Sequence, residues 1–560
     1  MHIEDVSNLF TFAGGLGMFL YGMHVMADGI QKTAGDKLKQ LLGILTNNKI
    51  VAVLVGALIT AIIQSSGATT VMVVGFVNAG IMSLGQAVGV IMGANIGTCI
   101  TSWIVSLGQL GDAFKAISPE LYAPLFIGIG AFFVMFSNKQ KKKLAGEILV
   151  GLGFLFVGLT FMKNSASSYT DLPIFRSAFI LMGSNPLLGI LMGVIVTGLM
   201  QSSSASVGIL QTIAASGGVV TAASAMYISL GSNIGSCFTA LLSSIGAPKN
   251  AKRAAVIHLM FNVIGSIIFG TILFVFFSVN QRLANGSINS VGISIFHTIF
   301  NITNTILLLP FSNLLVKASK LFVKGEEDED ADKDGAKQLL LHLDDRIMES
   351  PTFAVESVVK EVIHTGYVAL DNVNLSIEAM LENDIEKANK VKEIENNIDK
   401  MVNLVSNYLV KISNLSLSEK QHILVNNMFY TISNIERVGD HAENLAELAI
   451  EKCSHNIKFS DKAQEEMVSI CKVARDSFAQ SILAREEMQL EHVEEVVALE
   501  DKVDTLEEFL REKHIERLSN NICDSETGVV FIDALTNLER ISDHSLNIAN
   551  YVKDELLRLA

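Results

Sequence analysis

Long apolar runs separated by short polar loops dominate the first 320 residues of the chain. Runs of about 20 apolar residues have the length of helices that cross the ~30 Å hydrocarbon core of a bilayer. From about residue 350 the pattern changes, because Val, Ile, Leu and Met recur there at the i, i+3, i+4 spacing of amphipathic helices. We therefore predict an all-α chain, with a polytopic membrane domain over 1–320 and a soluble helical domain over 350–560.

The soluble part is predicted to contain six long helices. Their expected ranges are 352–382, 385–413, 417–453, 460–490, 492–520 and 526–558. Between the two domains, residues 321–349 include the charged run KGEEDEDADKDGAK. Like charges in such a run repel one another and favour a solvated tether. We therefore assign 321–349 as an acidic linker.

Two polar phrases interrupt the apolar runs, and each occurs twice. QSSGATT at 64–70 matches QSSSASV at 201–207, and GANIGTCITS at 93–102 matches GSNIGSCFTA at 231–240. The offsets between the copies are 137 and 138 residues. A chance match of two phrases at nearly one offset is improbable, so the membrane domain contains an internal duplication. We place the two repeats at about 9–137 and 147–316.

Charge then gives each repeat a direction. Residues 1–320 carry a net charge of +9 and the remainder −24, within a total of −15. The basic loops 32–49, 137–143 and 247–253 are expected in the cytoplasm by the positive-inside rule. The first QSS phrase then enters the membrane from the cytoplasm and the second from outside. Inverted repeats with broken or re-entrant helices are typical of secondary transporters.

The QSS phrases are also expected deep in the membrane. Gln64 lies 15 residues after Lys49, and Gln201 lies 15 residues after Pro186. At 1.5 Å per residue this is roughly 22 Å into the bilayer. Hydroxyls at that depth either bond to carbonyls of their own helix and join helices together, or form a binding site. The duplication favours the site, in which neutral oxygens suit Na⁺ and helix N-termini suit an anion. Because the phrases contain no charged residue, an anion bound there needs cations beside it.

These paired phrases resemble those of the type II sodium/phosphate cotransporters, over about 1–320. The resemblance implies sodium-driven uptake of inorganic phosphate, with sodium ions co-transported, at a site made by both repeats. The nature of the anion comes from the resemblance alone. Carried over by motif, the phosphate- and sodium-binding residues are Gln64, Ser65, Ser66, Thr69, Asn95, Thr98, Gln201, Ser202, Ser203, Ser204, Asn233 and Ser236. The first motif has Gly67 where the second has Ser204, so the two halves differ chemically.

A further matched pair stands near the end of the membrane part. HLMFN at 258–262 and HTIFN at 297–301 each place His and Asn four residues apart, on one helix face. Such a pair can relay protons or can join helices by hydrogen bonds, and the second interpretation is the favoured one.

The soluble part is duplicated as well. NIERVGDHAENLAE at 434–447 matches NLERISDHSLNIAN at 537–550. Glu436 with Asp440, and Glu539 with Asp543, are i, i+4 pairs that repel on one helix face. Each pair needs a cation, which is either a neighbouring arginine or a metal. These phrases resemble the PhoU family, which implies two three-helix bundles over about 350–560 that can carry a divalent or iron-type metal on Glu436, Asp440, Glu539 and Asp543.

Together these features predict a bacterial-type, multi-pass protein of the plasma membrane (the inner membrane of a two-membrane cell), with its C-terminal domain in the cytoplasm. We expect a sodium-coupled phosphate symporter whose PhoU-like module is regulatory and binds a cytoplasmic protein. No nucleophile–base pair, nucleotide loop or zinc spacing is present, so we expect no enzyme, and we expect no nucleic-acid partner. The alternatives are a phosphate sensor or scaffold without transport, a carrier of another anion, and an exporter. Homo-oligomerisation stays open.

Overall fold

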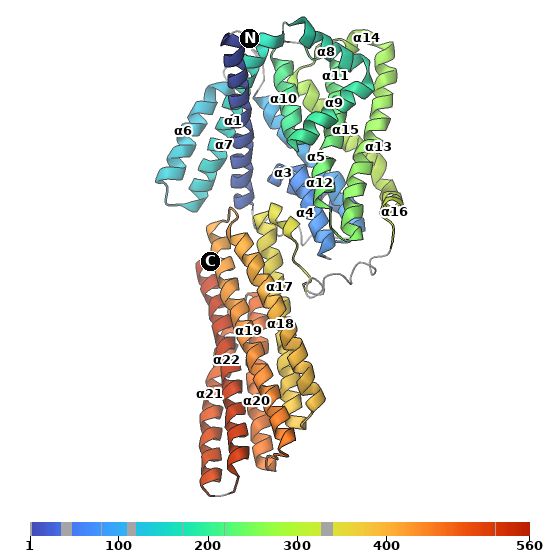
Figure 1. Ribbon diagram of the computed structural model, residues 1–560. Helices are drawn as coiled ribbons and strands as arrows, with labels where there is room; N and C mark the ends of the chain where they lie inside the picture. The colour runs from blue at the N-terminus through green and yellow to red at the C-terminus, as the bar shows by residue number, and fades with distance from the viewer. Residues whose placement is uncertain are drawn as a thin grey trace. The chain divides into compact units, whose positions relative to one another are not determined.

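The computed structural model describes residues 3–34, 48–79, 81–108, 119–170, 172–217, 219–325, 340–520 and 522–559. In these ranges the chain is almost entirely helical, and its only β pairing is an isolated bridge between Thr221 and Ser287. The predicted all-α class is confirmed. The chain divides into two compact units (Figure 1): the first holds Met1–Ala331 and Asp344–Phe353, and the second holds Asp332–Leu343 and Ala354–Ala560.

The first unit is built from apolar helices. In chain order they are α1 (Ile3–Thr33), α3 (Lys49–Ile63), α4 (Ser66–Asn78), α5 (Leu84–Leu107), α6 (Pro119–Phe136), α7 (Gln140–Thr170), α8 (Pro173–Ser184), α9 (Pro186–Met200), α10 (Ser203–Ala215), α11 (Ala222–Gly235), α12 (Cys237–Ser243), α13 (Lys249–Val279), α14 (Gln281–Ala284), α15 (Ser290–Leu308), η2 (Leu309–Phe311) and α16 (Ser312–Phe322).

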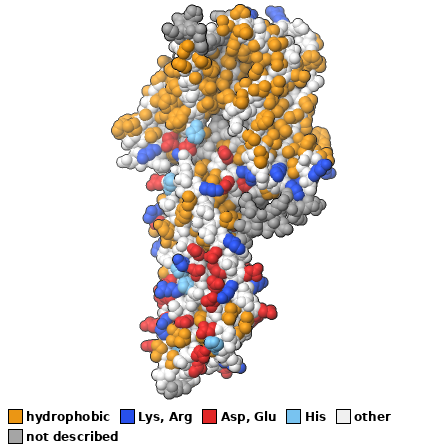
Figure 2. Space-filling model, in the orientation of Figure 1, with side chains coloured by type: hydrophobic (Ala, Val, Ile, Leu, Met, Phe, Trp, Pro, Cys, Tyr) orange, Lys and Arg blue, Asp and Glu red, His pale blue; other side chains and the backbone are white. Residues whose placement is uncertain are grey.

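Among the described residues, six of these spans are long and apolar enough to cross a membrane, or seven if the bent pair α8–α9 counts as one span. Large apolar side chains stand on the outside of the unit, with Leu199 and Val279 about four-fifths exposed. Figure 2 shows apolar side chains covering this unit on the face drawn, whereas charged side chains gather on the second unit. An apolar exterior of this extent is suited to lipid rather than water. The protein is a membrane protein.

Glycines of the duplicated GxNIG phrases bring the helices of each repeat close together. A Cβ added to Gly93 on α5 would lie 2.0 Å from the carbonyl oxygen of Val53 on α3. A Cβ added to Gly231 on α11 would lie 1.9 Å from the carbonyl oxygen of Ile190 on α9. Only glycine permits such backbone contact, which is a common way of packing helices in lipid. The two repeats therefore share one packing arrangement, α3 on α5 and α9 on α11.

The last helical span of the predicted second repeat is interrupted. It consists of α15, the 3₁₀ turn η2 and α16. Pro310 lies in this turn, and proline cannot donate the backbone hydrogen bond that would continue an α-helix.

A short segment that precedes the long helices of the second unit packs inside the first unit. Residues 326–339 of the predicted linker lie outside the described residues, whereas Asp344–Phe353 belongs to the first unit. Its 3₁₀ turn η4 (Asp345–Glu349) contributes Ile347, which is fully buried in a cluster with Met72 and Phe76 of α4. The Phe353 ring meets the Phe76 ring edge-on at 5.4 Å.

The second unit is a set of six long helices, as the sequence predicts. They are α17 (Pro351–Glu382), α18 (Ile385–Ser413), α19 (Glu419–Ser454), α20 (Asp461–Glu487), α21 (Leu490–Ser519) and α22 (Ser525–Leu559). The predicted ends agree with these bounds to within three residues. Apolar residues of each helix face inward, and Arg485 near the end of α20 forms a buried ion pair with Glu555 near the end of α22.

Candidate functional site

Both QSS motifs are breaks between two helices, and the two breaks have the same geometry. Gln64 (φ 60°) caps the C-terminus of α3, and Gln201 (φ 53°) caps that of α9. The backbone of both glutamines therefore adopts the left-handed helical conformation. This conformation is uncommon for residues other than glycine and is held in place by the surrounding structure. Ser65 and Ser202 follow with extended backbones, at φ −146° and −144°.

The first serine of each motif starts the next helix. Ser65 Oγ accepts a hydrogen bond from the Ala68 amide at 3.1 Å, and Ser202 Oγ accepts one from the Ala205 amide at 3.2 Å. These are N-caps of α4 and α10. Each break therefore sets the carbonyl end of one helix beside the N–H end of the next. Carbonyl oxygens at a helix end attract cations, and N–H groups at a helix start attract anions.

The serines that follow in each motif have little exposed surface, and among the described residues their hydroxyl groups make no hydrogen bond. Ser66, Ser203 and Ser204 are less than 9% exposed. Within the described part of the chain, none of the three hydroxyls makes a hydrogen bond. Polar groups inside a membrane domain normally find a partner. Three unused hydroxyls at two helix starts therefore form the clearest ligand-binding feature of this unit.

The start of α4 also touches the second repeat. A Cβ on Gly67 would lie 3.1 Å from Oγ1 of Thr239, which belongs to α12. Gln64 is held within its own repeat, because its Oε1 accepts a hydrogen bond at 3.0 Å from Thr101 of α5. The first motif thus lies beside Thr101 of its own repeat and Thr239 of the other. Gln201 is exposed, and Thr239, the counterpart of Thr101, instead donates to the Ser236 carbonyl at 2.9 Å.

Several other predicted ligands already have partners. Thr69 is fully buried, accepts from Thr60 Oγ1 at 3.0 Å and donates to the Ser65 carbonyl at 2.9 Å. Thr98 and Ser236 donate to carbonyls of their own helical turns, at 3.2 and 2.7 Å. In this conformation the three O–H groups donate within the helices, so these hydroxyls can offer a ligand only acceptor lone pairs.

The HxxxN pairs lie on α13 and α15 and form two matching sets. The Cys237 thiol donates to the His258 carbonyl and the Cys99 thiol to the His297 carbonyl, both at 3.6 Å. The side-chain amide of Asn262 then contacts Cys237 Sγ. Asn301 contacts Cys99 Sγ in the same way. The duplication of the sequence is thus repeated in the contacts of these two helices with α5 and α12.

The sets differ in what the buried asparagine of the GxNIG phrase does. Asn233 bonds to His297 Nε2 at 3.0 Å and donates to Asn301 Oδ1 at 2.7 Å. Its counterpart Asn95 donates to the Ile91 carbonyl of its own helix at 3.0 Å. Among the described residues, His258 has no partner at either ring nitrogen, and Asn262 Oδ1 has none. Hydrogen bonds therefore join Asn233 to the histidine and asparagine of α15, whereas within the described ranges no equivalent bonds join Asn95 to those of α13.

One polar cluster was missed by sequence reasoning. Gln211 of α10 is fully buried, and its Nε2 lies 2.8–3.2 Å from oxygens of four serines. These serines come from α5 and α15 and are Ser102, Ser106, Ser290 and Ser294. A glutamine within an apolar helix was a usable signal, but the serine positions become significant only once three helices are assembled.

The second unit carries two acidic faces, each built from two helices. Glu436 and Asp440 of α19 lie near Glu395 and Asp399 of α18, whose charges act on one another. In the other half, the carboxylate oxygens of Glu500, Asp504 and Asp543 lie within 4.8 Å of one another. The α18 and α21 members were not predicted from the sequence, although both form Glu–Asp pairs at i, i+4 and are 105 residues apart.

These faces have more negative charge than the nearby arginines balance. Arg437 lies 3.2 Å from Asp440, and Arg540 lies 3.1 Å from Asp543. Burial raises the pKa of Glu539, and the Asp543 charge raises it further despite Arg540. Burial also raises the pKa of Asp504, followed by the charge of Asp543. Carboxylate oxygens are the ligands that hard divalent ions prefer, so the donor set fits such a metal.

The histidines beside these pairs join the two halves. His441 Nδ1 lies 2.9 Å from Asn537 Oδ1, and His544 Nδ1 lies 2.9 Å from Asn434 Oδ1. The two imidazole rings stack at 5.7 Å. These contacts give both histidines a packing role at the pseudo-symmetric contact of α19 and α22.

Comparison with known proteins adds the family. The sequence profile described as Na+/Pi-cotransporter matches residues 18–164 and 173–302, so that each matched block contains one QSS motif. The chain belongs to the Na+/Pi-cotransporter family. The PhoU domain profile matches 362–449 and 467–552, each block with one acidic phrase, so the C-terminal part of this family member is a PhoU domain.

Relatives with curated names point to phosphate transport. The chain is 22% identical over 560 residues to YjbB of Escherichia coli, which is named for inorganic phosphate export, with 98% of each chain covered. It is 36% identical over 103 residues to the sodium-dependent phosphate transport protein 2A of Rattus norvegicus, which covers 18% of this chain and 16% of that protein. Among solved structures, PhoU from Pseudomonas aeruginosa is 22% identical, covering 37% of this chain and 98% of that one, with a TM-score of 0.35.

Proposed function

We propose that this protein is a sodium-coupled symporter that carries inorganic phosphate into the cell. The observation that carries the proposal is the pair of matched helix breaks, at which the hydroxyls of the largely buried residues Ser66, Ser203 and Ser204 make no hydrogen bond to any described residue. Phosphate has several oxygens that accept hydrogen bonds, and these hydroxyls and the first N–H groups of α4 and α10 are donors. The family supplies phosphate as the anion.

Sodium coupling follows from the charge of this site. The described helices α3, α4, α9 and α10 contain no acidic residue and only Lys49 as a cation, at the far end of α3 from the motif. A phosphate anion held at the breaks therefore has no side-chain counter-charge. Na⁺ bound to carbonyl and hydroxyl oxygens would supply it, so the cation and the anion bind more tightly together than apart. The sodium-dependent transporters that share part of this sequence agree with this coupling.

Alternating access would use the two repeats. The loop charges orient the α3–α4 break from the cytoplasm and the α9–α10 break from outside, which makes the repeats inverted. Rocking of one repeat against the other around the breaks would open the site first to one side and then to the other. In this orientation the protein spans the plasma membrane and its PhoU domain is cytoplasmic.

The segment Asp344–Phe353 supports a regulatory role for the PhoU domain. Arg346 Nε donates to the Ser243 carbonyl at the end of α12, at 2.7 Å, while Asn78 at the end of α4 bonds to Asp344. Helices α4 and α12 meet at Gly67 and Thr239, so the segment fastens the far ends of two helices that form the site. The chain then continues from Pro351 into α17 of the PhoU domain. A change in that domain, through metal or a cytoplasmic partner protein, would reach the site along this segment.

Metal binding at the acidic faces is part of the proposal. Glu500, Asp504 and Asp543, with Glu539 beside them, offer hard oxygen ligands on one face, and Glu395, Asp399, Glu436 and Asp440 offer them on the other. A divalent ion should raise the melting temperature of the purified protein. The rise should shrink in Asp504→Asn but not in Glu526→Gln, whose carboxylate pairs with His455 instead. An equal rise in both variants would place the metal elsewhere.

Transport itself is tested in proteoliposomes with radiolabelled phosphate. Under an imposed sodium gradient we expect phosphate to accumulate on the low-sodium side, and accumulation to stop when choline replaces sodium. A phosphate flux that is the same in sodium and in choline would contradict the symport proposal. Phosphate binding without flux would favour a sensor, and equal flux of sulfate would favour a broader anion carrier.

A second candidate function is phosphate export. It is favoured by the likeness to YjbB, which extends over both the membrane part and the PhoU domain. The direction is decided in cells that lack other phosphate carriers. Import predicts growth on limiting phosphate that depends on external sodium, whereas export predicts loss of phosphate from preloaded cells.

A further inference from the structure

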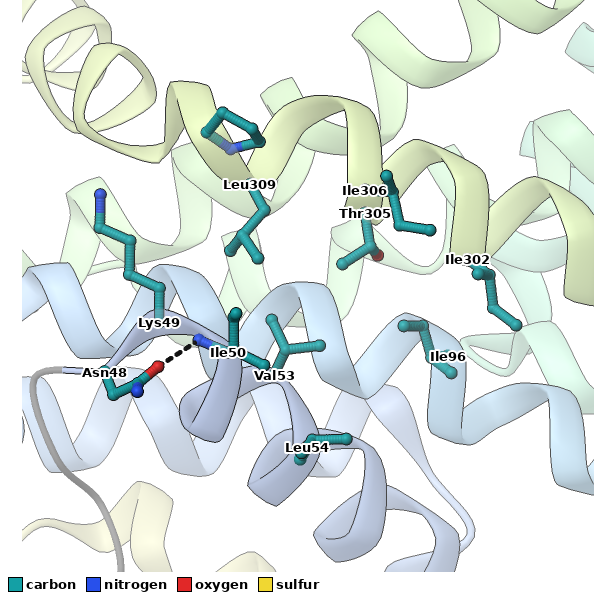
Figure 3. Close-up of a pocket in the computed structure, with 11 residues that line it drawn as sticks. Asn48, Lys49, Ile50, Val53, Leu54, Ile96, Ile302, Thr305, Ile306 and Leu309 are labelled. Atoms are coloured by element: carbon teal, nitrogen blue, oxygen red, sulfur yellow. Dashed lines mark hydrogen bonds between the residues drawn. The ribbon is translucent and has the colours of Figure 1, made fainter.

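A groove opens on the outside of the membrane unit between α3 and the junction of α15 with η2 (Figure 3). It has a volume of about 690 Å³. Ile50 and Leu54 of α3 line one wall, Ile302 and Ile306 of α15 line the other, and Ile96 of α5 lies between them. Ligand-sized cavities hold about 300–1,000 Å³, so the groove can take an organic chain of substantial length.

The groove faces the lipid. Ile50, Leu54 and Ile306 are each more than half exposed. The hydroxyl of Thr305 has no proton to donate to a ligand in the groove, because it donates to the Asn301 carbonyl at 2.8 Å. Apart from one end, the walls therefore offer only apolar contact, which suits an acyl chain.

That end is positively charged. Lys49 lies at the first turn of α3, and its Nζ donates to Asn313 Oδ1 of α16 at 3.0 Å, which leaves two further N–H groups. The segments 48–60, 84–107 and 290–322 contain no Asp or Glu, whereas Lys317 and Lys320 follow on α16. No acidic side chain of the walls therefore neutralises Lys49.

We propose that this groove binds an anionic phospholipid, with an acyl chain between α3 and α15 and the headgroup phosphate on Lys49. The acyl chain alone cannot give selectivity, because lipid tails and apolar side chains are alike in lipid. Selectivity comes from the charge of Lys49, since one lysine at a membrane surface contributes about 1 kcal/mol toward an anionic lipid, or about fivefold in affinity. The other repeat lacks this feature, because Pro186 stands at the position of Lys49.

The single tryptophan of the chain makes a direct test practical. Trp103 is replaced by phenylalanine, and one reporter tryptophan is introduced at Leu54 in the groove. The matched control reporter is Leu191→Trp on α9, the counterpart of Leu54 in the other repeat, with a similar exposure of 52% against 58%. The full-length protein is reconstituted, and quenching by phosphatidylglycerol with brominated acyl chains is compared with quenching by brominated phosphatidylcholine.

We expect phosphatidylglycerol to be favoured about fivefold over phosphatidylcholine at Leu54→Trp and not favoured at Leu191→Trp. Adding Lys49→Gln should bring the Leu54→Trp ratio close to one, and Lys49→Arg should keep it. Equal ratios at both reporters, a ratio unchanged by Lys49→Gln, or no quenching at Leu54→Trp by either lipid would each overturn the proposal. None of these outcomes depends on phosphate transport, so the two proposals fail separately.

Discussion

His297 Nε2 lies 3.0 Å from Asn233 Oδ1, whereas its counterpart His258 has no partner among the described residues. Removing one member of a buried hydrogen bond leaves the other unsatisfied, at a cost of about 1–3 kcal/mol. Replacing a buried polar group that has no partner by an apolar group of similar shape is close to neutral. We therefore expect His297→Leu to lower the melting temperature of the purified protein clearly, and His258→Leu to leave it nearly unchanged.

Each substitution is the matched control for the other, because both histidines are buried at equivalent places on α15 and α13. Equal losses of thermal stability would show that His258 has a partner that the described residues do not include, such as an ordered water. The asymmetry between the two sets would then be absent in the protein in solution.

Gly67 tests the contact between the repeats. A methyl group there would approach Thr239 Oγ1 to 3.1 Å, so the start of α4 must shift or Thr239 must turn. We expect Gly67→Ala to reduce phosphate uptake by about tenfold while the protein still inserts, since a small misplacement of a binding group costs this much. Gly14→Ala is the matched control, because a Cβ at Gly14 meets nothing within 4 Å.

Thr239→Ala should partly restore uptake in the Gly67→Ala background, because it removes the atom that the new methyl group meets. If the uptake of the double variant is instead reduced by the product of the two single effects, α4 and α12 do not act together at the site.

Arg346 tests the proposed link to the PhoU domain. Its hydrogen bond to the Ser243 carbonyl fastens the end of α12 and favours the arrangement seen here. A hydrogen bond from a charged group contributes about 1.5–3 kcal/mol, which is roughly tenfold or more in an equilibrium, so Arg346→Ala should free α12 and raise the sodium-dependent uptake rate by about tenfold. Glu349→Gln, in the same turn but exposed, should leave the rate unchanged. An unchanged or lower rate in Arg346→Ala would contradict a restraining role.

In metal-free protein, Glu395 gives the stability of the PhoU domain a dependence on pH. Burial raises the pKa of this carboxyl to about 8, and the charges of Asp399, Asp440 and Glu443 add to the effect. Between the ordinary glutamate pKa and about 8, the folded state holds a proton that the unfolded chain has lost. Stability therefore falls as the pH rises through this window.

Glu395→Gln removes this effect. We expect the variant to melt several degrees above the parent at pH 8.5 and close to it at pH 5, at about 2–4 °C per kcal/mol for a domain of this size. Some dependence of the melting temperature on pH should persist in the variant, because burial also raises the pKa of Glu361 to about 7. A pH profile of melting identical to that of the parent would show that Glu395 is solvated in the folded protein.

Local structure was largely predictable from the sequence, for identifiable reasons. The breaks at Gln64 and Gln201 follow from polar phrases that interrupt apolar runs, and the six helices of the PhoU domain follow from their apolar spacing.

Contacts between distant segments were not predictable. Nothing in the sequence indicates that Arg346 reaches Ser243, or that Gln211 gathers serines from two other helices. Such contacts depend on how helices assemble rather than on how each one forms. The twelve candidate ligands came from duplicated motifs. Eight of them carry hydroxyls, and the structure separates these into five that already have partners and three that have none among the described residues.

The central claim is that the two helix breaks hold phosphate together with sodium. Its most direct test is equilibrium binding of radiolabelled phosphate to the purified protein, in sodium and in choline, for the parent and for Ser66→Ala combined with Ser203→Ala. We predict saturable binding by the parent in sodium only, and a loss of at least tenfold in affinity in the double variant. Parent-like binding by the double variant, or binding by the parent that is equally tight in choline, would contradict the account.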